Sequence, residues 1–323
     1  MKIIVSVAVI GLALSSFCCE PEISCGWYIR KLKPYDPIKA GAEIITAINI
    51  TNDIVFPIDN RGWWSVEDKS ELIIAPYDLA EFNGDIYIHV EGTIYIFNKE
   101  TLQIERKIVI NFLEPEYVHS WARSICSRGF VVVNNRAFLY TAYRDLLTID
   151  LSTGDVLFID NLNNIKEKLD LTQNMGVAVI GYNITDDLFW FLIEIHEPYN
   201  DYGYFYQHDY FYFYQYEENI NTFSHHSIRT AKYNSSVREW SAYINNNTVW
   251  QNGYSGPDPN ERIWDIGMNR CSLDDPFTSL HFIDVEHLGT LSIPQSIIYD
   301  PPYIWIMVER EDQIQMLKLL PNG

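Results

Sequence analysis

The chain has 323 residues, of which 47% are hydrophobic and 15% aromatic, and its formal net charge is −20. Apolar content on this scale can bury a large core, which argues against an intrinsically disordered chain. A strongly acidic surface repels phosphate backbones, so nucleic acid is not an expected partner. Strand-favouring residues dominate and long helical periodicity is hard to find, which predicts an all-β protein.

The N-terminal residues 1–19, MKIIVSVAVIGLALSSFCC, have the pattern of a secretory signal. Lys2 is followed by an apolar run that ends at Leu14, and small residues come next. The run is too short for a comfortable membrane span. The alternative interpretation is a buried first strand. We expect an exported protein (periplasmic, cell-surface or extracellular) with no transmembrane span in the mature chain.

Five cysteines bear on anchoring and redox state. Cys18 and Cys19 lie where a bacterial lipoprotein would carry its acylated cysteine, so a lipid anchor at either residue and simple cleavage near Cys19 both stay open. The others are Cys25, Cys126 and Cys271. An exported protein can keep a disulfide, but three thiols leave one over, and their pairing is not predictable.

Two segments, residues 82–108 and 133–159, repeat one pattern. Each reads as four strands separated by three turns. Asn83-Gly84 and Asn134-Asn135 tolerate the positive φ that two-residue hairpins need. Alternation inside each strand then places one face toward a core.

The tightest match within this repeat lies at its third strand and the turn that follows. Residues 94–104 read IYIFNKETLQI and residues 146–156 read LLTIDLSTGDV. A hydrophobic strand, an Asp or Asn and a Thr-Gly turn resemble the blade repeat of quinoprotein-like and YVTN-type β-propellers. The resemblance covers most of the chain after about residue 35 and implies a β-propeller. It implies no quinone, because the cofactor motifs of quinoprotein dehydrogenases are not evident.

The repeats predict six blades, and a seventh is the alternative because the later copies are widely spaced. The blade centres are expected near Trp64, Ile96, Thr148, Tyr212, Phe282 and Ile314. The last copy stops after its third strand, so we predict that an N-terminal strand, residues 26–32, completes that blade and closes the ring. The chain would then be a signal segment, residues 1–19, and one propeller domain, residues 20–323. The alternative architecture is a pair of β-sandwiches.

The aromatic run YGYFYQHDYFYFYQY, residues 202–216, is predicted to serve two purposes. Its alternating part, residues 210–216, is expected to pack between blades, with Phe inward and Tyr toward a half-wet layer. Residues 197–209 and 245–267 are expected to be long connections that bind a ligand. The alternative for residues 197–209 is a short hairpin extension that covers its blade. The predicted ligand-binding residues are Tyr199, Tyr202, Tyr204, Tyr206, His208, Asp209, Trp250, Tyr254 and Trp264.

The sequence shows no strong catalytic motif. No histidine spacing matches a zinc pattern, so no metal site and no cofactor are predicted, although an acidic surface could attract calcium. Propeller enzymes gather carboxylates from several blades, and the candidates are Asp78, Glu116, Asp187 and Asp265.

Three functional classes follow from these patterns. The favoured one is an exported binding module with a protein or carbohydrate ligand, namely a glycan, a peptide or an envelope protein. The alternative is a carbohydrate- or lactone-directed hydrolase or lyase that uses channel carboxylates or a metal. The third is a structural component of an envelope complex.

Overall fold

A computed structural model describes the parts of the chain that carry most of the repeats. These parts are residues 29–30, 41–54, 71–74, 77–90, 92–111, 129–141, 144–173, 175–199, 203–218, 222–231, 242–245, 248–255, 265–272, 281–284, 288–289, 292–293, 296–310 and 313–322. Apart from one short helix, α2 (Leu162–Lys168), the regular elements in these parts are strands. The all-β prediction is therefore confirmed. No helix among these residues is long and apolar enough to cross a bilayer.

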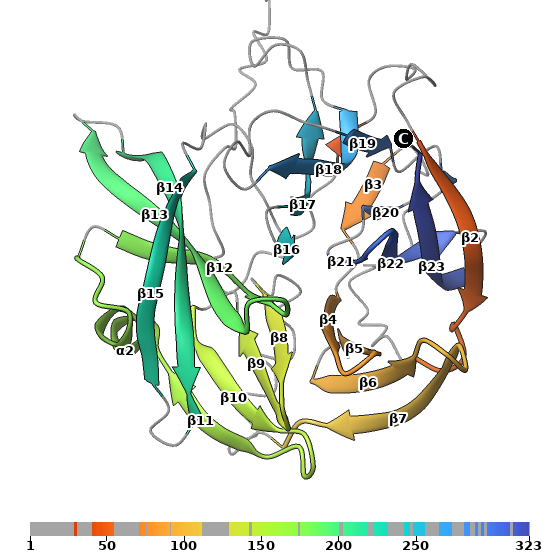
Figure 1. Cartoon of the computed structure of the whole chain (residues 1–323), viewed down its shortest axis with the longest axis horizontal. Helices are drawn as coiled ribbons and strands as arrows, with labels where there is room; N and C mark the ends of the chain where they lie inside the picture. Colours follow the sequence, from red (N-terminus) through yellow and green to blue (C-terminus); the bar gives the residue numbers. More distant parts are fainter. Residues whose placement is uncertain are drawn as a thin grey trace, which may run out of the picture.

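Five antiparallel sheets of four strands form the body of the molecule (Figure 1). The first contains β4 (Asp78–Phe82), β5 (Asp85–Val90), β6 (Thr93–Asn98) and β7 (Gln103–Val109). The second contains β8 (Phe130–Val133), β9 (Arg136–Tyr140), β10 (Leu146–Asp150) and β11 (Val156–Asp160). The third contains β12 (Met175–Asn183), β13 (Leu188–Tyr199), β14 (Gly203–Glu217) and β15 (Thr222–Ala231).

The remaining strands complete two more such sheets and a small one. The fourth sheet contains β16 (Ala242–Asn245), β17 (Thr248–Ser255), β18 (Asp265–Ser272) and β19 (His281–Asp284). The fifth contains β21 (Ile297–Asp300), β22 (Tyr303–Arg310), β23 (Gln313–Pro321) and, next to β23, the N-terminal strand β2 (Ala42–Asn49). A three-stranded sheet pairs β1 (Ile29–Arg30) and β20 (Ser292–Ile293) with β3 (Glu71–Ile74).

The five sheets are arranged like the blades of a propeller (Figure 1). Their first strands contact one another in the order β4, β8, β12, β16 and β21, and β21 contacts β4 again. A cluster of buried apolar side chains lies between each pair of neighbouring sheets, including the last and the first. Each blade therefore buries both faces, which supplies the hydrophobic stabilisation of the fold.

The blade count is a correction to the sequence prediction, because the described residues form five four-stranded sheets where six or seven were expected. Ile96, Thr148, Tyr212, Phe282 and Ile314 fall in five different sheets, as expected. Trp64 lies outside the described residues, and the nearby β3 belongs to the three-stranded sheet. No seventh blade occupies the wide spacing in the described part of that region. Its extra residues lengthen the hairpins of the third and fourth sheets instead.

The turns of the two best repeats follow the sequence closely. Asn83 and Gly84 have φ values of 52° and 87°, and Asn134 has φ 55°, so these hairpins use the left-handed conformations that Asn and Gly tolerate. Asn98 and Asp150 precede the last turn of each repeat, and the side-chain Oδ1 of each accepts a backbone N–H two residues further on. The recurring Asp or Asn is thus a turn-forming residue.

An N-terminal strand joins the last sheet, but the predicted segment is wrong. Residues 42–49 form β2, which pairs antiparallel with β23 from Ala42 opposite Pro321 to Asn49 opposite Gln315. Within residues 26–32 the described strand is β1, and it pairs with β3. Burial alternates along β2, with buried or half-buried residues between exposed ones.

The aromatic run packs between sheets, as predicted for residues 210–216. Phe213 lies in the cluster shared with the fourth sheet, and Tyr214 lies in the cluster shared with the second sheet. Tyr214 is 1% exposed and donates a hydrogen bond to Leu169 O (2.8 Å), so the expected half-wet layer is wrong at this position. A blade between two neighbours buries both faces, and a tyrosine there needs a partner for its hydroxyl.

Candidate functional site

A small cavity, partly open to solvent, lies where the first strands of the five sheets meet. Every one of these strands contributes to its wall. Among the described residues, the wall contains four aromatic side chains, two carboxylates and no Lys, Arg or His. The aromatic and acidic members are Phe130, Tyr182, Trp190, Tyr243, Asp78 and Glu81. A concave, mostly apolar pocket with a few convergent polar groups is the usual form of a ligand site.

Asp78 begins β4 and carries a buried carboxyl group at the cavity wall. The residue is 2% exposed, and its Oδ2 has no hydrogen-bond partner among the described residues. Burial raises the pKa of this carboxyl above its ordinary value, and the neighbouring His89 only partly opposes that shift. A buried acid of this kind, held in a cavity, is a common feature of functional sites.

His89 faces Asp78 from β5, directly across the strand pair. The Gly92 N–H donates to Nε2 of His89 (3.4 Å), so the proton of the neutral ring lies on Nδ1. His89 Nδ1 is 4.0 Å from Asp78 Oδ2, which is too long for a hydrogen bond. His89 therefore lies beside the carboxylate without donating a hydrogen bond to Asp78 Oδ2.

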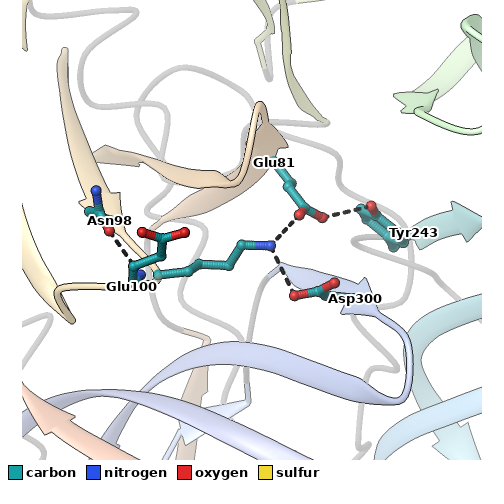
Figure 2. A network of polar contacts seen from close by, with 6 residues as sticks. Glu81, Asn98, Glu100, Tyr243 and Asp300 are labelled. Carbon is teal, nitrogen blue, oxygen red and sulfur yellow. Dashed lines mark hydrogen bonds and ion pairs between the residues drawn. The ribbon is translucent and has the colours of Figure 1, made fainter.

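Glu81, at the other end of β4, belongs to a polar network that joins three sheets (Figure 2). Lys99 donates from the β6–β7 turn to Glu81 Oε1 and to Asp300 Oδ2, the latter at 2.9 Å. Tyr243 of β16 donates to Glu81 Oε2 at 3.3 Å. Burial and the Glu81 charge raise the pKa of Tyr243 well above its ordinary value, so the hydroxyl stays a donor. The charge of Glu81 is thus already compensated.

Burial lowers the pKa of Lys99, but the hydrogen bonds that Lys99 donates to Glu81 and Asp300 outweigh that effect, and the net pKa is raised. Lys99 therefore stays charged and holds the first and fifth sheets together. Ser296, immediately before β21, adds a hydrogen bond to Leu79 O at 3.2 Å. These contacts fix the cavity wall at the junction of the last and first sheets.

The predicted carboxylate candidates do not gather in one place. Asp78 lines the cavity. Asp187 lies in the β12–β13 turn, where it accepts a hydrogen bond from the cavity residue Tyr182. Asp265 begins β18, opposite Ser255, and Glu116 lies outside the described residues. Within the described chain, no three His, Cys, Asp or Glu side chains form a group that could hold a metal ion.

The described part of residues 197–209 continues two strands, so of the two predicted alternatives the hairpin extension is the form found and the long loop is wrong. β13 and β14 pair as far as Tyr199 opposite Gly203, with Tyr204 opposite Pro198 and Tyr206 opposite His196. His208 and Asp209 continue the same pairing. Tyr202 lies outside the described residues. Tyr and Phe favour strands, so the alternation continues where a loop was expected.

In the second predicted connection, residues 245–267, the described residues after Asn245 belong to β17 and β18. Tyr254 pairs with Ile266 on β17 and β18, and Trp264 lies outside the described residues. Trp250 is fully buried and packs against Tyr299 with ring centroids 5.9 Å apart. Trp250 is therefore a core residue, and no described contact brings it to the central cavity.

Sequence reasoning missed most of the cavity. Glu81, Tyr243 and Trp190 of the wall, and Lys99 beside it, carry no motif, and they come from four different strands or turns. Gly181 is a sequence feature whose role is visible only in the structure, because a Cβ at this position would lie 2.0 Å from the Trp190 ring. The indole thus needs a glycine beside it to occupy the cavity wall. The predicted lipidation residues Cys18 and Cys19 lie outside the described residues.

The chain has a propeller-like ring of sheets. No family model matches the sequence, and no curated protein matches it. Among solved structures, a glutaminyl cyclase from Myxococcus xanthus is similar with TM-score 0.45 and 9% identity, over 87% of this chain and 97% of that chain. The β-propeller domain of Cps50 (Swd1) from Myceliophteria thermophila is similar with TM-score 0.37 and 7% identity, over 76% and 82%. Neither likeness bears on what this chain binds or catalyses.

Proposed function

We propose that the protein is an exported binding module whose central cavity receives a side chain of a peptide or protein ligand. The observation that carries this proposal is the composition of the cavity wall, which contains aromatic and aliphatic side chains and one buried carboxyl group, Asp78, whose Oδ2 lacks a hydrogen-bond partner among the described residues. Such a wall can bury an apolar stem and hold a polar end. A peptide supplies both, whereas most sugars present hydroxyl groups along their whole length.

The polar network around Glu81 supports binding more than catalysis. Glu81 accepts hydrogen bonds from Lys99 and Tyr243, so it is held as a structural anion and is poorly placed to act as a base. The network also pre-organises the cavity wall before any ligand arrives, and pre-organisation lowers the cost of binding.

Selection of a random peptide library displayed on phage, with the immobilised full chain as target, tests this proposal. Ile184 lines the cavity and is 38% exposed, so Ile184→Trp should fill its open side and abolish binding of the selected peptides. Ile228 on β15 is 48% exposed and not part of the cavity wall, so Ile228→Trp is the matched control. Equal binding of the peptides to Ile184→Trp and to the wild type would refute the cavity as the ligand site.

A second candidate is a carbohydrate- or lactone-directed hydrolase or lyase. One observation favours it: burial raises the pKa of Asp78 in a cavity that also contains Glu81, and a raised pKa is what a general acid needs. Release of nitrophenol from nitrophenyl glycosides, and base uptake during lactone opening, would show such turnover. Turnover that disappears in Asp78→Asn would favour the enzyme over the binding module.

A further inference from the structure

The geometry points to an alkylammonium group, as carried by a lysine side chain, as the chemical group that the central cavity recognises through Asp78. This inference rests on the proposed binding function and specifies its ligand.

The charge balance of the cavity favours a cation. Its described wall holds two carboxylates and no basic residue. Lys99, which is not part of the wall, already compensates Glu81. Asp78 has no comparable hydrogen-bonded cation, since the nearest basic atom, His89 Nδ1, lies 4.0 Å from its Oδ2. A ligand with a positive end would provide the missing counter-charge in a setting where water screens poorly.

Asp78 also provides the atom that an ammonium group needs. Asp78 belongs to the cavity wall, and its Oδ2 is buried and lacks a hydrogen-bond partner among the described residues. An unpaired acceptor in such a place costs free energy in the empty protein. A donor N–H from a ligand would recover that cost, and charge-assisted hydrogen bonds are the stronger kind.

The rest of the wall suits the remainder of a lysine side chain. Leu79, Val179 and Ile180 offer aliphatic surface for its methylene stem. Phe130 and Trp190 offer ring surface of the sort that attracts cations.

A metal ion fits this cavity less well than an ammonium group. Calcium takes six to eight oxygen ligands, whereas no group of three potential metal ligands occurs in the described part of the chain. An ammonium group has three donors and is satisfied by one or two acceptors together with ring faces. The available groups therefore match an organic cation.

The test titrates the full chain with Nα-acetyl-lysine methylamide and follows tryptophan fluorescence, because Trp190 lines the cavity. The expected result is saturable binding that is at least about tenfold weaker for the Nε-acetylated compound, which keeps the stem and loses the charge. Equal binding of the two compounds, or no saturable binding of the first, would overturn the inference. Tighter binding of glucosamine than of the lysine compound would also overturn it, in favour of an amino sugar.

Two variants locate the site. Asp78→Asn should weaken binding of the lysine compound at least about tenfold, since a truncated charge partner typically costs that much or more. Asp160→Asn is the matched control: Asp160 is also buried, but it pairs with Lys168 at 2.7 Å and is not part of the cavity wall. Unchanged binding in Asp78→Asn would overturn the inference. Displacement of the lysine compound by equimolar calcium chloride would overturn it as well.

Ile184 keeps the inference testable if the buried substitution fails to fold, because Ile184 is exposed at the cavity wall. Ile184→Arg should weaken binding of the lysine compound several-fold and Ile184→Glu should strengthen it, since the two differ in charge sign. Equal effects of the two variants would refute charge recognition. Peptide ligands lost in Ile184→Trp but indifferent to lysine acetylation would leave the proposed function standing and remove only this inference.

Discussion

Replacement of Lys99 by Met tests whether the network at the cavity holds the ring together. Lys99 joins Glu81 of the first sheet to Asp300 of the fifth sheet, and the Lys99 side chain is 14% exposed. Methionine keeps most of the apolar stem, so the variant removes mainly the charge and its two hydrogen bonds.

The expected loss follows from the carboxylates that the substitution leaves behind. Breaking a buried ion pair by removing one partner costs about 3–5 kcal/mol, because the other charge stays buried without compensation. The Asp300 side chain is 39% exposed, so water screens the negative charge that Lys99→Met leaves there. The Glu81 side chain is 10% exposed, so water screens its charge much less. We therefore expect the free energy of unfolding to fall by roughly 2–4 kcal/mol.

Urea denaturation followed by far-UV circular dichroism measures this loss. Lys107→Met on β7 is the matched control, since Lys107 is exposed and should change the free energy of unfolding by less than about 0.5 kcal/mol. The double variant Lys99→Met/Glu81→Gln removes the orphaned charge and should recover part of the loss. A Lys99→Met variant as stable as Lys107→Met would refute the reasoning.

Three further predictions concern turns, pH and the N-terminal strand. Gly154→Ala should lower the free energy of unfolding by more than about 2 kcal/mol, because the new Cβ would lie 2.1 Å from Val109 O. The control Gly84→Ala has open space around the new Cβ and the same sign of φ, so it should cost only about 1 kcal/mol. Equal urea midpoints for the two variants would contradict this prediction. Burial raises the folded-state pKa of Asp78, so its contribution to stability is present below the ordinary value of 3.8 and is lost as pH rises through the folded-state pKa. The difference in thermal midpoint between the wild type and Asp78→Asn should therefore widen in favour of the variant over that range, and a difference that stays constant with pH would count against the buried carboxyl. Because β2 covers the edge of β23, we expect it to close the ring. Removal of residues 1–49 should therefore cause aggregation or make unfolding non-cooperative, as judged by light scattering and circular dichroism, to a greater extent than removal of residues 1–40. Equal behaviour of the two truncations would argue against closure by β2.

Local features of the fold were predictable because each depends on neighbours in the sequence. The Asn83-Gly84 turn needs positive φ at both residues, and Asn and Gly are the residues that supply it. The strands of the two best repeats follow from alternation and turn residues in the same way. Architecture could therefore be inferred from a few well-spaced turns.

The blade count was not predictable in the same way, because strand length is not marked in the sequence. β13 and β14 run for 12 and 15 residues, and the same letters could equally have formed a shorter hairpin with a loop. The identity of the strand beside β23 is a long-range choice as well. It depends on how residues at opposite ends of the chain pack, and no local pattern records that.

The candidate site was predictable only at Asp78, which was one of four guessed carboxylates. Its neighbours in the cavity, such as Phe130, Ile180, Tyr243 and Ile297, come from the first strands of four other sheets. Nothing in their spacing links them until the sheets are placed around one axis. The aromatic run is the densest feature of the sequence instead, yet Phe213 and Tyr214 within it are core residues.

A crystal structure of the full chain soaked with Nα-acetyl-lysine methylamide would show whether the central cavity binds an alkylammonium group. We expect density for the compound inside the cavity, with its ammonium nitrogen within about 3.2 Å of Asp78 Oδ2. Density for the compound at a blade edge or on the β13–β14 hairpin, with Asp78 in contact only with water, would contradict it.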